Sequence, residues 1–154
     1  MSARRRAARI GAWALVATGA LHLLVVAAGA AVTASPAEQA ARRTMAATPV
    51  AIAGIERDLW QLYLGFSLAM ALFIIGLGAL NLIVLRHEPP RAGILLTLAV
   101  VLGALALSVL LLPPPPIVLL TISGAAFAYA SMPESRRPLR TGSPRTAAPS
   151  GRGR

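Results

Sequence analysis

The chain has 154 residues, of which 56% are hydrophobic and 13% charged, and its mean hydropathy is +0.70. Soluble domains carry about 25% charged residues, so this composition indicates a membrane protein before any segment is considered. The sequence holds no cysteine, which excludes thiol chemistry, and its formal charge of +10 does not indicate nucleic acid, because the arginines flank apolar runs.

A basic segment at residues 1–9 precedes an apolar segment at 10–32, which only Thr18 and His22 interrupt. About 20 apolar residues suffice to cross a bilayer as a helix. Residues 32–34 would also suit a signal-peptide cleavage site, but signal peptides have hydrophobic cores of only about 7–15 residues. The sequence therefore favours an uncleaved first transmembrane helix over a cleaved signal.

The connection at residues 33–57 contains a helix start signal. Ser35-Pro36-Ala37-Glu38 matches a capping box with proline at the first helical position. Glu38 and Arg42 follow at a spacing of four, an orientation that supports a helix. We expect a short surface helix from Pro36 to about Ala47.

The second apolar segment, residues 59–85, contains no charge, and as a helix it would cover about 40 Å. Polar and amphipathic side chains recur along it at alternating steps of three and four, which places them on one helix face. Glu56, four residues before the first of them, is expected to extend this stripe to the membrane surface. The stripe contains Trp60, Tyr63, Ser67, Met70, Ile74, Leu77 and Asn81.

A third span is expected at residues 92–112. Its small-xxx-small pairs, Ala99/Gly103 and Ala104/Ser108, are typical of helices whose backbones approach closely in lipid. The proline run at 113–116 should end this span and form a stiff polyproline II rod.

The fourth span is expected at residues 117–132. It is short, at roughly 24 Å, and Gly124/Ala128 gives it a packing seam. The tail at 133–154 is rich in Arg, Pro, Ser and Gly, cannot bury a core and is expected to be disordered.

The distribution of arginine predicts the orientation. Twelve of the fifteen basic residues fall in the segments that four spans would place on the side of the N-terminus, and three fall in the connection at 33–57. The positive-inside rule then places both termini in the cytoplasm and the connection outside. The expected fold class is all-α, an integral membrane four-helix bundle in a bacterial inner membrane.

Five residues form a candidate ligand pocket in the outer half of this bundle. An ionisable side chain within a span faces the bundle interior by default, which applies to His22. Purely structural roles are the alternative. His22 could form a hydrogen bond with Ser67 or a carbonyl that only stabilises the helix packing, and interfacial aromatic residues often serve as anchors alone. The candidate residues are His22, Glu56, Trp60, Tyr63 and Ser67.

We expect no cofactor and no metal site. A bis-histidine haem needs two axial ligands, but His87 lies in the polar turn at 86–91, far from His22. All five carboxylates lie outside the spans, which also disfavours a proton-coupled transporter.

Two segments resemble parts of a known group of proteins: Gly19-Ala20-Leu21-His22-Leu23-Leu24 and Trp60-Gln61-Leu62-Tyr63-Leu64-Gly65-Phe66-Ser67. With the four-span layout, they are similar to small uncharacterised bacterial membrane proteins, loosely the DoxX-like four-helix group. This resemblance implies a compact bundle whose first two helices share an interface that contains His, Trp and Tyr. It implies no reaction and no catalytic residue.

The function expected from the sequence is non-enzymatic. The chain would serve as an accessory subunit in the lipid bilayer, with a membrane protein partner or as a homo-oligomer, or it would bind a lipid-like ligand in the outer half of the bundle. The alternative is a membrane isomerase or reductase that acts on an apolar substrate with His22 as acid and base, a role that needs a pKa near the working pH.

Overall fold

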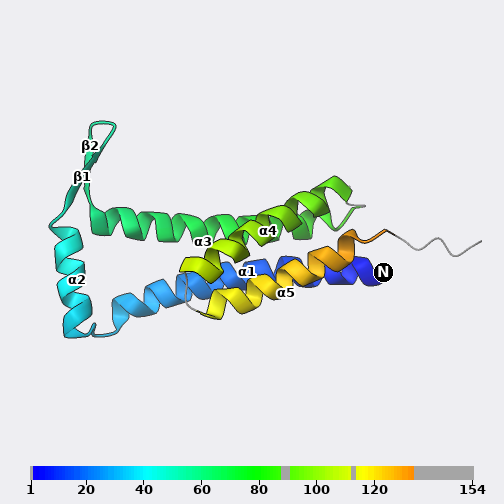
Figure 1. Cartoon of the computed structure of the whole chain (residues 1–154), viewed down its shortest axis with the longest axis horizontal. Helices are drawn as coiled ribbons and strands as arrows, with labels where there is room; N and C mark the ends of the chain where they lie inside the picture. Colours follow the sequence, from blue (N-terminus) through cyan, green and yellow to red (C-terminus); the bar gives the residue numbers. More distant parts are fainter. Residues whose placement is uncertain (1, 88–90, 112–113, 134–154) are drawn as a thin grey trace, which may run out of the picture.

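The computed structural model describes residues 2–87, 91–111 and 114–133. Within these ranges the chain forms five helices and one two-stranded antiparallel hairpin (Figure 1). The elements in chain order are α1 (Ala3–Ala31), α2 (Pro36–Ala46), β1 (Pro49–Ile52), β2 (Ile55–Asp58), α3 (Leu59–Val84), α4 (Arg91–Leu111) and α5 (Pro114–Ser131).

Three of these helices, α1, α3 and α4, are long and apolar enough to cross a membrane. They coincide with the segments expected as the first three spans, and α1 extends one further turn and more into the basic N-terminus. Helix α5 is apolar but shorter. The fold is therefore helical, as expected, apart from the small hairpin.

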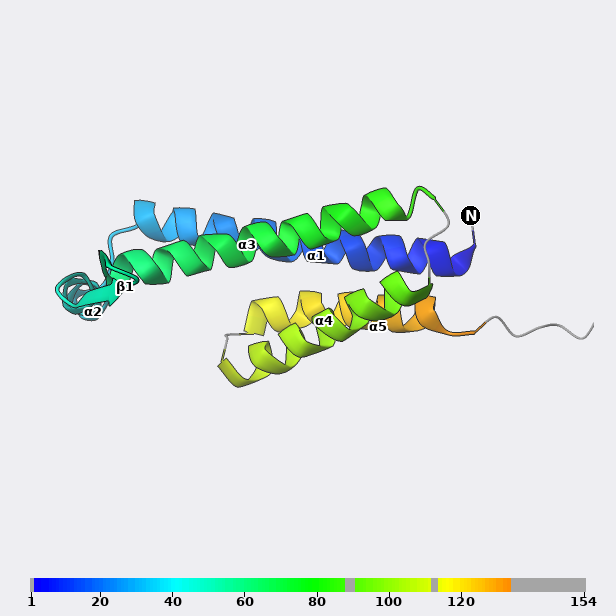
Figure 2. The same ribbon diagram turned by 90° about the horizontal axis from the view of Figure 1, so that it is seen from above.

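Helix α1 lies at the centre of the packing. It contacts α3 on one side and α5 on another, and α4 packs on α5. Figure 2 shows the result as two layers, one of α1 and α3 and one of α4 and α5. Helix α2 lies across one end of the first layer, and α2 followed by the hairpin connects the end of α1 to the start of α3 (Figure 1).

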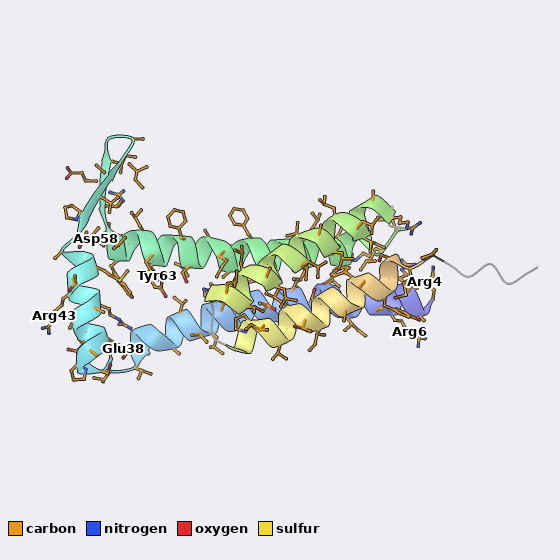
Figure 3. The ribbon with its side chains drawn as sticks, viewed as in Figure 1. Arg4, Arg6, Glu38, Arg43, Asp58 and Tyr63 are labelled. Carbon is orange, nitrogen blue, oxygen red and sulfur yellow. The ribbon has the colours of Figure 1, made fainter. Side chains whose placement is uncertain are left out.

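The two ends of the bundle differ in how many helices they contain. We call one end the arginine end and the other the α2 end. Arg4 and Arg6 lie at the arginine end (Figure 3), together with Arg5, Arg86 and Arg91. Helices α4 and α5 stop short of the α2 end in both ribbon views. The buried core accordingly lies toward the arginine end, and it comprises Ala8, Ala12, Leu15, Leu85, Val101, Leu120, Phe127 and Ala130.

Glycine permits the close approach of α1 and α3. A Cβ atom on Gly78 would lie 2.8 Å from the Ala12 carbonyl oxygen, and one on Gly19 would lie 2.7 Å from the Ala71 carbonyl oxygen. Real Cβ atoms do not approach that closely, so the two backbones meet where side chains are missing. These two contacts, about two helical turns apart along each helix, fix how α1 and α3 lie against each other.

The prediction that the small residues of α4 pack closely against another helix is partly wrong. Ala99 and Gly103 are exposed, and a Cβ atom on Gly103 would meet nothing within 4 Å. Ser108, of the second pair, is buried. Helix α4 contacts α5 with its wider side chains, such as Val101 near Gly124, so the small residues at 99 and 103 have no partner helix to approach among the described residues.

The polyproline rod expected at 113–116 is also wrong where the structure describes it. Pro114, Pro115 and Pro116 form the first turn of α5, and residue 113 lies outside the described residues. The backbone N–H groups of a first helical turn have no acceptor within the helix. Proline, which lacks this donor and has its φ near the helical value, is therefore tolerated there.

The hairpin was not expected from the sequence. It pairs Val50 with Arg57 and Ile52 with Ile55 across a two-residue turn. Both turn residues have positive φ, 49° at Ala53 and 81° at Gly54, which is the type I′ geometry that suits the twist of two antiparallel strands. Ala-Gly is a weaker turn signal than Asn-Gly, which explains why the pattern was missed.

The close contact of α1 and α3 predicts opposite effects for two glycine substitutions in one helix. Alanine normally stabilises a helix interior relative to glycine by about 0.5–1 kcal/mol. Gly76→Ala should follow this rule, since its Cβ atom meets nothing within 4 Å, whereas Gly78→Ala should destabilise the fold by about 1–3 kcal/mol through overpacking against Ala12. Thermal unfolding of both variants in mild detergent, monitored by gel filtration of heated samples, measures the difference between their unfolding midpoints. Equal midpoints for the two variants would contradict the packing described here.

Candidate functional site

In the three long apolar helices, charged side chains are confined to the helix ends. In α1 none follows Arg9, in α3 none lies between Asp58 and Arg86, and in α4 none follows Arg91. A helix that lies in lipid must keep charges out of its apolar part, because an isolated charge there is costly. The charge pattern and the lengths of the apolar helices thus both fit an apolar layer of the thickness of a membrane core.

At the arginine end, Arg5 holds the C-terminus of α3. Its Nε donates to the Leu85 carbonyl oxygen at 2.8 Å and its Nη2 to the Arg86 carbonyl oxygen at 2.6 Å. The last carbonyls of a helix lack partners within the helix, and a cation there also complements the helix dipole. Arg5 therefore sets the register of α1 against α3 at this end.

Near the other end of the α1–α3 contact, His22 meets Ser67. The His22 Nε2 and the Ser67 Oγ lie 2.8 Å apart, within hydrogen-bond distance, and both residues are partly buried. His22 thus faces α3, as expected for an ionisable residue in an apolar helix. The contact also matches the simpler expectation that His22 satisfies itself on Ser67.

Beyond this pair, α2 adds a cation between the two long helices. The Arg42 Nη2 donates to the Gly29 carbonyl oxygen of α1 at 3.1 Å, and its guanidinium lies 5.2 Å from the centroid of the Trp60 ring of α3. Trp60 stacks on Tyr63, with centroids 5.5 Å apart and an interplanar angle of 27°. Arg42 was expected only as a partner of Glu38 within α2. The spacing from Glu38 indicated only this pairing within α2, and the contacts with Gly29 and Trp60 depend on how α2 lies across the long helices.

The start of α2 follows the expected capping box. The Ser35 backbone N–H donates to the Glu38 carboxylate at 2.8 Å, and the Glu38 backbone N–H donates to the Ser35 hydroxyl. The bond from the Ser35 backbone holds the pKa of Glu38 below its usual range, and the Ser35 side chain and the nearby Arg42 add to this effect. This box fixes the helix that presents Arg42.

Glu56 does not lie on the helix face that the sequence suggested. It is exposed in strand β2, where it pairs with Ala51. Helix α3 begins only at Leu59, because the Asp58 carboxylate accepts from the Gln61 backbone N–H at 2.7 Å and caps the helix. A strand turns successive side chains to opposite sides, so the helical spacing from Glu56 to Trp60 has no structural meaning.

The expected stripe on α3 is divided among several surroundings. Trp60, Tyr63 and Ser67 belong to the contacts with α2 and α1 described above, and Figure 3 shows Tyr63 on the side of α3 that faces α1. Asn81 accepts a hydrogen bond from the Thr97 hydroxyl of α4 at 3.1 Å, as an interhelical contact. Met70 is 38% exposed.

The residues of α3 that lie deepest against α1 are not the polar ones. Ala71 and Gly78 are the buried residues of α3, and neither was singled out from the sequence. The close contact runs beside the expected stripe because small side chains, rather than polar ones, let the two helices approach.

Among the five candidate residues, the structure therefore brings together His22 with Ser67 and Trp60 with Tyr63, and it separates Glu56 from them. Arg42 joins the aromatic pair. We call Arg42, Trp60, Tyr63, His22 and Ser67 the α2-end cluster. In the described ranges no three His, Asp or Glu residues are grouped as metal ligands. Comparison of the chain with protein-family models, curated proteins and solved structures found no match.

The His22–Ser67 contact predicts an energetic coupling that a double-mutant cycle can measure. Interhelical hydrogen bonds in membrane proteins contribute about 0.6 kcal/mol on average, with a maximum near 1.7. His22→Ala and Ser67→Ala should show a coupling energy in this range in unfolding experiments in detergent. His22→Ala and Asn81→Ala, about 20 Å apart along the helices, should be additive. Additivity of the first pair would show that the two side chains do not interact.

Proposed function

We propose that this chain is a four-span integral membrane protein of a bacterial plasma membrane, with both termini in the cytoplasm. The length of α5 supports a fourth crossing, since its 18 residues cover about 27 Å, close to the 30 Å of a bilayer core. The arginine distribution supports the orientation, because the arginine end would be cytoplasmic and the α2 end external.

This orientation predicts the behaviour of reporter fusions. A periplasmic reporter fused after Arg43, in α2, should be active, and one fused after Arg140 should be inactive, because only the first would leave the cytoplasm. Enzyme activity in intact bacteria is the measurement, with total fusion protein as the control for expression. The reverse pattern would overturn the orientation, and activity at both positions would overturn the fourth crossing.

We further propose that the α2-end cluster binds a lipid-like ligand in the outer leaflet. The supporting observation is the guanidinium of Arg42, which lies between α1 and α3 at the level where α4 and α5 are no longer present. A guanidinium recognises phosphate or carboxylate through planar donors. The ligand that fits is an amphiphile with an anionic head and an apolar chain.

The depth of the cluster supports a leaflet ligand. Seventeen residues separate Arg5 from His22 and nineteen separate Ser67 from Arg86, which gives about 25 Å and 28 Å from the layer that Arg5 and Arg86 share. Trp60, about 39 Å from that layer, falls at headgroup level, where tryptophan is enriched. In a bilayer about 42 Å thick with its headgroups, the midplane lies about 21 Å from that layer, so the His22–Ser67 pair falls in the outer half of the bilayer core, roughly 4–7 Å beyond the midplane.

The enzymatic alternative has less support. It requires His22 as acid and base with Tyr63 or Glu56 assisting, but Glu56 lies in strand β2, and the hydrogen-bond partner of His22 is a serine hydroxyl. An accessory role requires a partner protein but no particular chemistry at the cluster. Purification in mild detergent distinguishes this role from ligand binding, because the two roles predict different co-purified molecules.

The ligand proposal predicts that Arg42→Gln lowers the occupancy of a co-purified anionic amphiphile severalfold. Arg43→Gln is the matched control, since Arg43 is its neighbour in α2, is exposed and points away from the bundle (Figure 3). Native mass spectrometry after purification in mild detergent measures the occupancy, and His22→Leu should lower it as well. Equal occupancy in the Arg42 and Arg43 variants would exclude the ligand site. Co-purification of a membrane protein in stoichiometric amount, without an amphiphile, would favour the accessory role.

A further inference from the structure

The β1–β2 hairpin has no role in the cluster described above, and its position is unusual. It projects at right angles to the long helices and extends past α3 on the side away from α1 (Figure 1), and Figure 2 shows it foreshortened at the same end. Since α3 runs along the bundle axis, the hairpin lies parallel to the plane of a membrane that this axis crosses.

The register gives the hairpin two chemically different faces. Residues paired across an antiparallel ladder share a face, and successive residues alternate between faces. One face therefore carries Val50 with Arg57 and Ile52 with Ile55. The opposite face carries Ala51 with Glu56 and Pro49 with Asp58. The first face is apolar and cationic, and the second is acidic.

The apolar face is open to its surroundings. Ile52 is 52% exposed and Ile55 is 58% exposed, and the turn between them, Ala53-Gly54, adds no polar side chain. A two-stranded hairpin by itself is only marginally stable in water. A surface that covers the isoleucines would therefore also stabilise the ladder.

The level of the hairpin identifies the surface. Twenty-eight residues separate Asp58 from Arg86, or about 42 Å of helix, and a bilayer with its headgroups is about 40–45 Å thick. The hairpin thus extends sideways at the height of the outer headgroups. A face with β-branched apolar residues and an arginine matches the boundary between acyl chains and phosphates.

We propose that the Val50, Ile52, Ile55 and Arg57 face of the hairpin rests on the outer leaflet beside α3, with the isoleucines at the acyl boundary and Arg57 at the phosphates. The acidic face, with Glu56, is turned to water. This inference rests on the proposed membrane crossing of α3, and it assigns the hairpin as a lateral lipid anchor for the α2 end.

The natural lack of cysteine allows a direct test. Single-cysteine variants Ile55→Cys, Glu56→Cys and Phe73→Cys, each carrying a nitroxide label, are reconstituted in vesicles of phosphatidylcholine and phosphatidylglycerol. Spin-label accessibility to oxygen, which enters lipid, is compared with that to a water-soluble nickel complex. Phe73, 78% exposed in the middle of α3, reports on the crossing itself.

The proposal expects a label at Phe73 to favour oxygen strongly, a label at Ile55 to favour oxygen severalfold more than one at Glu56, and Arg57→Glu to reduce the preference at Ile55. Equal nickel accessibility at Ile55 and Glu56, with Phe73 in lipid, would overturn the anchor and leave the crossing intact. Shielding of Ile55 from both reagents would overturn it in favour of a protein contact. Nickel accessibility at Phe73 would overturn the crossing and the anchor together.

Discussion

The rest of the structure depends on the close backbone contact between α1 and α3. Gly19 and Gly78 remove the side chains that would separate the two helices, and Arg5 fixes their register by binding the last carbonyls of α3. In lipid no hydrophobic effect drives one apolar helix onto another, so van der Waals contact and hydrogen bonds between the helices carry the association. Helix α5 adds to this pair through Ser123, which donates to the Gly11 carbonyl oxygen at 3.0 Å.

The same contact determines the geometry of the α2-end cluster. A fixed register places His22 opposite Ser67 and leaves the two helix ends where α2 can bridge them through Arg42. The cluster is held by the packing of α1 against α3 and by the capped helix α2, which crosses the ends of both.

The sequence predicted the features that follow from composition and local spacing. The three long apolar helices, the capping box of α2 and the facing of His22 toward Ser67 depend on run length, on short-range hydrogen bonds and on the cost of a polar group in lipid. The features that it missed depend on which helix lies against which. Gly78 and Gly103 look alike in sequence, yet only Gly78 has a partner backbone, and Glu56 matched a helical spacing that the Asp58 cap interrupts.

The shorter reach of α4 and α5 divides the molecule into parts of unequal stability. The arginine end buries side chains from four helices, whereas the α2 end is held by α1, α3 and a short crossing helix. Local opening requires the least free energy where few buried contacts are lost. The parts of α1 and α3 toward the α2 end can therefore separate while the arginine end stays packed, and this separation would open a lateral path between the two helices for a lipid molecule that never passes through water.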